Sequence, residues 1–299
     1  MRWLKRLISR GDPAQLELPL ARVREPDRNL HKGGRSFYFF DFDDNVAFLT
    51  TPMFLFHRDT KSEIQISSRE FARQSAFIGK SGPFADYELD HDPVVGSFRH
   101  FRDVNLSWLR KAMRHRQVFV QDLAASLGLP DIDWKGPSWN CFYHAVFNAR
   151  PVSLITARGH SPLTIERGID LWVREGHLPA RPNYLSIYPV SHPEIKRELG
   201  LVDSFSIPHL KQKALRASVE KALRVYGENP HHRFGMSDDD PRNIEWITEE
   251  MRLLKNEHPT ISFFIIQTHG DQMTKSEIFT DHVVEKKIEP AAQLTLFDE

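Results

Sequence analysis

Apolar residues gather in five short runs along the chain, and amphipathic stretches separate most of them. The runs are continuous rather than alternating, so we expect strands that are buried on both faces. They span residues 37–41, 152–156, 184–190, 232–236 and 261–267. Helical patterns are predicted at residues 139–148, 162–175, 210–226 and 241–256, two of which begin with proline. This alternation predicts an α/β fold with a parallel sheet covered by helices on both faces.

Residues 46–137, between the first two strands, follow no long period of either kind. Short strand-like pieces are predicted at 46–50 and 63–67, and short helices at 68–77, 106–115 and 119–127. Glycine and proline punctuate them. The segment is rich in phenylalanine, which needs to be buried, so we predict a folded insertion rather than a linker.

The two ends of the chain show weaker patterns. Residues 1–35 are expected to form a flexible lead-in that starts with a short basic amphipathic stretch, and residues 271–299 a C-terminal tail. No apolar run is long enough to span a bilayer. The single cysteine, Cys141, excludes an internal disulfide and fits a reducing compartment, so we expect a cytoplasmic protein.

Charge alone favours no class of partner, because 40 basic and 40 acidic residues cancel. Two local acidic clusters are more informative. Asp41, Asp43 and Asp44 follow the first strand, and Asp238 and Asp239 follow the fourth. In open parallel sheets, functional groups gather beyond the carboxyl ends of the strands. Carboxylates crowded there repel one another, and Mg²⁺ relieves that repulsion. The alternative is that each cluster is a solvated turn.

Phosphoryl transfer from a monoester suits such a group of residues. A carboxylate can attack phosphorus and form an aspartyl-phosphate, and a second carboxylate can protonate the leaving oxygen and then activate water. Alternate residues of an extended strand share a face, so Asp41 and Asp43 can border one cleft. Thr156 after the second strand, a lysine and Mg²⁺ would share the charge of the phosphoryl oxygens.

This arrangement resembles the haloacid dehalogenase (HAD) superfamily of phosphohydrolases. Its first motif, an apolar strand followed by Asp-x-Asp, matches Asp41 and Asp43. The resemblance implies that Asp41 is the nucleophile and Asp43 the general acid and base. The second motif matches Thr156 as a phosphate-binding hydroxyl. The third, a lysine, matches Lys213 or Lys211; we assign catalysis to Lys213 and substrate binding to Lys211.

The fourth HAD motif, an acidic pair, matches Asp238 and Asp239. The resemblance therefore implies a Mg²⁺ site made of Asp41, the main-chain carbonyl of Asp43, Asp238 and Asp239. It covers about residues 37–45 and 139–268, and it implies a Rossmann-type HAD core with residues 46–137 as an inserted cap. Because Asp43 is an acid, phosphatase chemistry is favoured over dehalogenation.

The sequence also departs from the family at several positions. Asp44-Asn45 stands where the family usually has Gly-Thr or Gly-Val, and Met236-Ser237 precedes the second acidic cluster where glycine is common. Arg158 is predicted to bind substrate, although a solvated loop carrying both Arg158 and His160 is an equal alternative. Asn243 is expected on the helix surface rather than at the metal site.

Each end of the chain carries a short peptide that resembles the segment by which bacterial replication and repair proteins bind the sliding clamp. The two peptides are Gln15–Leu20 and Gln293–Phe297. A glutamine and spaced leucines can dock in an apolar groove, or they can pack on the protein itself.

We predict a Mg²⁺-dependent phosphomonoester hydrolase whose substrate is a phosphorylated small molecule, a nucleotide or a nucleic-acid end. The alternatives are a phosphotransferase and a non-catalytic protein tethered to the clamp.

Overall fold

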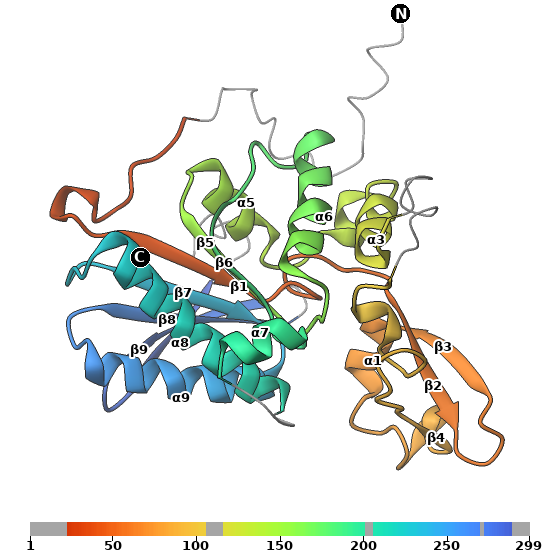
Figure 1. Cartoon of the computed structure of the whole chain (residues 1–299). Coiled ribbons are helices and arrows are strands. Elements are labelled where there is room, and N and C mark those ends of the chain that lie inside the picture. The colour runs from red at the N-terminus through yellow and green to blue at the C-terminus, as the bar shows by residue number, and fades with distance from the viewer. Residues whose placement is uncertain (1–22, 106–115, 201–205, 270–271, 289–299) are drawn as a thin grey trace, which may run out of the picture.

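The computed structural model describes residues 23–105, 116–200, 206–269 and 272–288 (Figure 1). Its main feature is a seven-stranded sheet of order β10-β9-β8-β7-β1-β5-β6. The strands are β1 (Ser36–Phe40), β5 (Pro151–Thr156), β6 (Asn183–Pro189), β7 (Arg233–Asp238), β8 (Ser262–His269), β9 (Gln272–Ile278) and β10 (Val283–Ile288). Strand β1 pairs in parallel with β5 and β7, which confirms the predicted α/β fold. The sheet is mostly rather than entirely parallel, because β9 and β10 are antiparallel.

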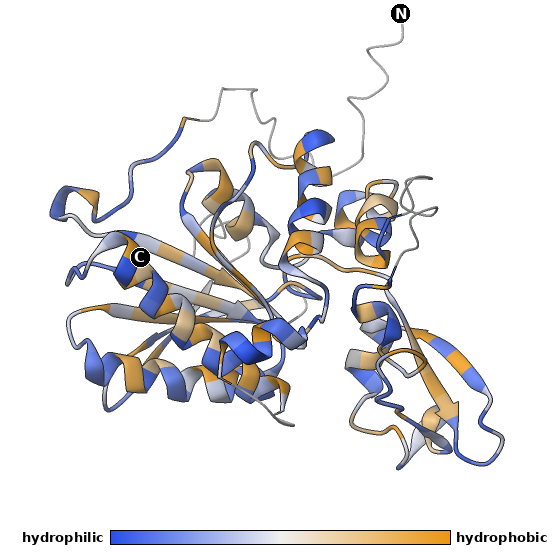
Figure 2. Ribbon diagram, viewed as in Figure 1, coloured by the Kyte–Doolittle hydropathy of each residue, from blue (hydrophilic) through white to orange (hydrophobic). Residues whose placement is uncertain are grey.

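Helices cover both faces of this sheet (Figure 1). One face carries α5 (Trp139–Phe147) and α6 (Pro162–Arg174), and the other carries α8 (Ile207–Tyr226) and α9 (Pro241–Glu257). The neighbouring helices are α3 (Val118–Ser126), α4 (Asp131–Trp134) and α7 (Pro193–Glu198). Alternate residues of β1 explain the two layers, because they point to opposite faces. Tyr38 and Phe40 belong to one apolar cluster with residues of α3, α5 and α6, whereas Phe37 and Phe39 belong to another with residues of α8 and α9. Apolar and polar residues accordingly alternate along the helices (Figure 2).

The insertion has two parts with different packing. The first part is a small antiparallel sheet of β2 (Pro52–His57), β3 (Glu63–Ser67) and β4 (Tyr87–Glu88), joined by α1 (Ser68–Gln74) and centred on its own apolar cluster. The second part, α3 and α4, packs on the main body through Phe119 and Trp134. The strand predicted at 46–50 is wrong: Val46 and Ala47 form a turn in which both amides donate to Phe42. The helix predicted at 106–115 lies outside the described residues.

The segments next to the two ends are more ordered than the sequence indicates. Asp27, in the predicted lead-in, accepts hydrogen bonds from the amide and hydroxyl of Ser36 at 2.7 and 2.8 Å, and it lies 3.4 Å from Arg150. Residues 272–288, assigned to the tail, instead form β9 and β10, which extend the sheet in antiparallel fashion. The two clamp-like peptides lie outside the described residues. None of the helices in the described ranges is long and apolar enough to cross a membrane.

Candidate functional site

The two acidic clusters meet at the carboxyl edge of the sheet. Asp41 directly follows β1, and Asp238 is the last residue of β7, the strand beside it. A hydrogen bond joins the two segments there: the Asp41 amide donates to the Ser237 carbonyl at 2.8 Å. Sequence reasoning predicted this convergence from strand order in parallel sheets alone.

A buried lysine joins the two clusters. Lys211 extends from the start of α8, and its Nζ lies 2.9 Å from Asp41 Oδ1 and 2.7 Å from Asp238 Oδ2. Burial by itself lowers the pKa of Lys211, but the two carboxylates outweigh burial and raise the pKa above its usual value. Lys211 is therefore a cation locked between two acids.

Lys213, to which catalysis was assigned, is exposed to solvent. The structure thus places Lys211, not Lys213, at the site. The helical period explains the difference: Lys211 lies four residues before Leu215 and eight before Val219, both in the buried stripe of α8. Lys213 falls on the opposite side of the helix, so this signal was present in the sequence.

Asn243, in the first turn of α9, supports Asp238 from the other side. Its Nδ2 donates to Asp238 Oδ1 at 2.9 Å, and the residue is only 4% exposed, so its predicted place on the helix surface is wrong. Its Oδ1 is buried and has no hydrogen-bond partner in the described part of the chain. An amide oxygen left in this state is suited to a bound cation or water.

The carboxylates themselves fit a divalent cation. Ligand oxygens of Asp41, Asp238 and Asp239 lie within 4.8 Å of one another. Burial, opposed by Lys211 and assisted by the neighbouring acids, raises the pKa of Asp41 well above its usual value. Burial and Asp238 also raise the pKa of Asp239 to about 7. A cation with hard oxygen preference, such as Mg²⁺, would stabilise the ionised forms of this set.

Asp43 lies beside this cluster but is held by a different partner. Arg158 donates from Nε to Asp43 Oδ2 at 2.9 Å and from Nη2 to Oδ1 at 2.6 Å, a bidentate ion pair. The Thr156 hydroxyl lies 3.4 Å from Asp43 Oδ2. Arg158 is fully buried, so the solvated-loop alternative for this residue is wrong.

His160 is buried next to Arg158. Burial, Arg158 and Arg102 lower its pKa well below the usual value, so the imidazole is neutral. Neither ring nitrogen has a hydrogen-bond partner in the described part of the chain. His160 is therefore unsuited to hold a phosphate by charge.

Asn45 organises the loop after β1, a role that sequence reasoning missed. Its Nδ2 donates to the carbonyls of Asp41 and Ser237, and its Oδ1 accepts from Ser237, Ser138 and Thr268. The preceding residue, Asp44, has φ 56°. Glycine adopts this left-handed conformation readily and aspartate tolerates it, so Asp44 can occupy this position of the turn.

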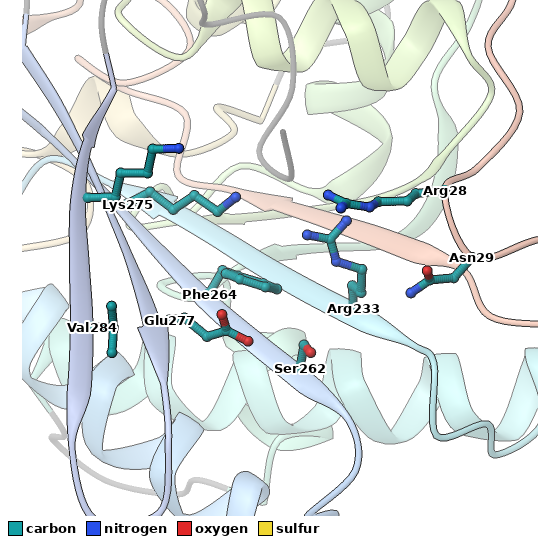
Figure 3. A pocket seen from close by; sticks show the side chains of 9 residues that line it. Arg28, Asn29, Arg233, Ser262, Phe264, Lys275, Glu277 and Val284 are labelled. Atoms are coloured by element: carbon teal, nitrogen blue, oxygen red, sulfur yellow. The ribbon is translucent and has the colours of Figure 1, made fainter. Parts of the chain in front are cut away.

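A separate cavity of about 370 Å³ lies on the face of β7 to β10 (Figure 3). Four cations and one carboxylate line it, namely Arg28, Arg233, Lys275, Lys286 and Glu277. Arg233 is the first residue of β7, whereas Asp238 is the last. The cavity therefore shares none of its lining residues with the acidic cluster.

The carboxyl edge of the sheet thus carries two adjoining groups of side chains, one around Lys211 and one around Arg158. The first combines a buried nucleophile candidate with carboxylates close enough together to hold a cation, and the second holds a candidate proton donor. No family model, no curated protein and no solved structure matches this chain, so the site is defined by its geometry.

Proposed function

We propose that the protein is a Mg²⁺-dependent phosphomonoester hydrolase of the HAD type. The observation that supports this most is the convergence of Asp41, Asp238 and Asp239 around Lys211 at the carboxyl edge of a parallel sheet. Buried carboxylates that destabilise one another are typical of a functional site. The HAD-type connectivity, with an insertion between the first and second motifs, is part of the same proposal.

The reaction would proceed in two steps. An Asp41 carboxylate oxygen attacks phosphorus, and the bond to the leaving oxygen breaks. Asp43 must first take up a proton against its ion pair with Arg158; it then gives that proton to the leaving oxygen and releases the alcohol. The Asp43 carboxylate then takes a proton from water, whose oxygen attacks the aspartyl-phosphate. Inorganic phosphate leaves, and Asp41 regains its carboxylate.

The remaining residues would bind charge. Asp41, Asp238, Asp239 and the main-chain carbonyl of Asp43 would hold Mg²⁺, which supplies positive charge to the phosphoryl oxygens when bound. Lys211 fixes the orientation of the Asp41 carboxylate. The Thr156 hydroxyl, next to Asp43, would donate to a phosphoryl oxygen.

Hydrolysis of p-nitrophenyl phosphate with and without Mg²⁺ tests this proposal. We expect Mg²⁺-dependent release of phosphate and at least a thousandfold loss in Asp41→Asn, because the amide is not a nucleophile. Asp240→Asn is the matched control. The Asp240 side chain adjoins the cluster, caps α9 and pairs with the exposed Arg242, and asparagine caps equally well. Equal losses in the two variants, or no activity in the native chain, would overturn the proposal.

The substrate class requires a second measurement. A screen of phosphorylated metabolites and of 3′- and 5′-phosphorylated oligonucleotides should identify the preferred monoester. Adding a small alcohol to the same assay separates hydrolysis, which gives inorganic phosphate, from phosphotransfer, which gives a new phosphate ester.

A further inference from the structure

The surroundings of Arg158 are more specific than its predicted role in substrate binding requires. The side chain is fully buried. Its guanidinium carbon lies 4.8 Å from the ring centroids of both Phe101 and Phe119. Both rings come from the inserted region, Phe101 from the end of a short 3₁₀ helix (Arg99–Phe101) and Phe119 from α3. The insertion therefore fixes the position of this guanidinium.

A chain of hydrogen bonds continues from Arg158 into the insertion. Nη2, which donates to Asp43, also donates to Thr51 Oγ1 at 2.7 Å. The Thr51 hydroxyl in turn donates to Asp122 Oδ2 at 2.6 Å. Thr51 is fully buried and immediately precedes β2, and Asp122 belongs to α3. We call this series, Asp43–Arg158–Thr51–Asp122, the relay.

Both connections to the small sheet meet at this point. The chain enters the small sheet after Thr51 and leaves it through Phe101 and Arg102. The Phe101 carbonyl accepts a hydrogen bond of 2.7 Å from the amide of Gly159, the residue after Arg158, and Arg102 forms a parallel bridge with Gly159. A shift of the small sheet would therefore move the partners of Arg158.

We propose that Thr51 and Asp122 are positioning residues, which fix the Arg158 guanidinium and through it the orientation of the Asp43 carboxyl toward the leaving oxygen. The proposal rests on the proposed function, because it assigns a purpose to Asp43 in that reaction. Arg158 donates to Asp43 from both Nε and Nη2, and Nη2 also donates to Thr51. Losing the Thr51 hydroxyl would leave Asp43 attached to an arginine that has lost its polar anchor.

The leaving group distinguishes this role from a purely structural one. An alkyl phosphate needs a proton on its departing oxygen, whereas p-nitrophenolate departs without one. Misplacing Asp43 therefore slows the first substrate far more than the second. A general defect in folding, metal binding or nucleophile geometry would slow both substrates equally. The parameter to compare is kcat/KM, which reports the steps up to release of the leaving group.

The test compares Thr51→Val, which removes the hydroxyl, with Thr51→Ser, which keeps it. Each is assayed on p-nitrophenyl phosphate and on the alkyl phosphate that the native chain cleaves fastest. General acid catalysis contributes about 10²–10⁴-fold, so we expect the ratio of kcat/KM for the alkyl ester to that for the aryl ester to fall about tenfold or more in Thr51→Val. Thr51→Ser should restore the ratio to within about threefold. Asp122→Asn, which leaves the Thr51–Arg158 bond in place, provides a milder second variant and should lower the ratio less.

The outcomes separate the two levels of the proposal. If the native chain cleaves both esters but Thr51→Val loses both in equal proportion or loses neither, the relay is refuted and the hydrolase stands. If the native chain cleaves neither ester, the proposed function fails and the relay fails with it. If Thr51→Val aggregates, Asp122→Asn becomes the test. An unchanged ratio of kcat/KM for the alkyl ester to that for the aryl ester in Asp122→Asn then refutes the relay.

Discussion

Replacing Lys211 by methionine gives the sharpest test of the buried cluster, because it removes the charge and keeps most of the side-chain volume. Two carboxylates would then face each other without a counter-charge, at positions now 2.9 and 2.7 Å from Nζ. Unit charges 4 Å apart interact by about 4 kcal/mol at an effective dielectric constant of 20. Loss of hydration offsets part of this, and breaking a buried pair by removing one partner costs about 3–5 kcal/mol. We expect a loss of that size in the free energy of unfolding.

Urea denaturation at pH 8 in the presence of a chelator measures this loss, since the acids are least able to escape by protonation there. Lys213→Met is the matched control: it has the same chemistry, two residues along the same helix, on an exposed side chain. Exposed substitutions usually change stability by less than about 0.5 kcal/mol. Variants that differ by less than 1 kcal/mol would refute the buried Asp41–Lys211–Asp238 arrangement, and the proposed catalytic site would lose its foundation.

Three further predictions concern the same scaffold. The folded-state pKa of Asp239 is raised to about 7, so its contribution to the free energy of unfolding is present at low pH and is lost as pH rises through 7. The free energy of unfolding of the metal-free protein should therefore fall by up to about 4 kcal/mol between pH 4 and 8. In urea titrations, Asp239→Asn should flatten that pH profile. Asn45→Ala strips partners from two buried carbonyls and should cost about 2–4 kcal/mol in the same assay. On an exposed helix, Gly168→Ala would stabilise the protein by about 1 kcal/mol. In α6 the added Cβ would lie 2.6 Å from Phe119 and 2.5 Å from Leu123, so the melting temperature of the variant should fall.

Burial pattern decided which strands could be predicted from the sequence. The five predicted strands are continuous apolar runs because both faces of the sheet are covered there. The outer strands β9 and β10 carry charged residues such as Lys275, Glu277 and Lys286, and they were assigned to a tail. The opposite error occurred at Val46 and Ala47, which are apolar because a turn buries them rather than a sheet. An apolar run indicates that a segment is buried. It also indicates a strand only where helices cover both faces of the sheet.

The site divides in the same way. Asp41, Asp43 and Asp238 were predictable because they lie at or just beyond the carboxyl ends of strands, and those ends meet in a parallel sheet. Lys211 and Asn243 were predictable in principle from the helical period, since each lies on a buried stripe. The partnership of Arg158 with Asp43 was not, because it depends on how the insertion packs against the loop after β5. This pairing joins the loop after β1, the loop after β5 and the insertion. No single one of these segments carries a periodic pattern that would reveal it.

Stability alone does not account for the charges at the carboxyl edge of β1 and β7. Replacing a buried ion pair by apolar residues of similar size is often neutral or stabilising, so a gain in stability does not explain Asp41, Lys211 and Asp238. Raised pKa values at Asp41 and Asp239 indicate that the folded chain opposes their ionisation. Lys211 supplies one positive charge to this site, and a second one would favour the ionised forms of Asp41 and Asp239. A cluster that is unfavourable in the isolated chain, and placed where parallel sheets carry their active sites, supports the proposal that this site binds a cation.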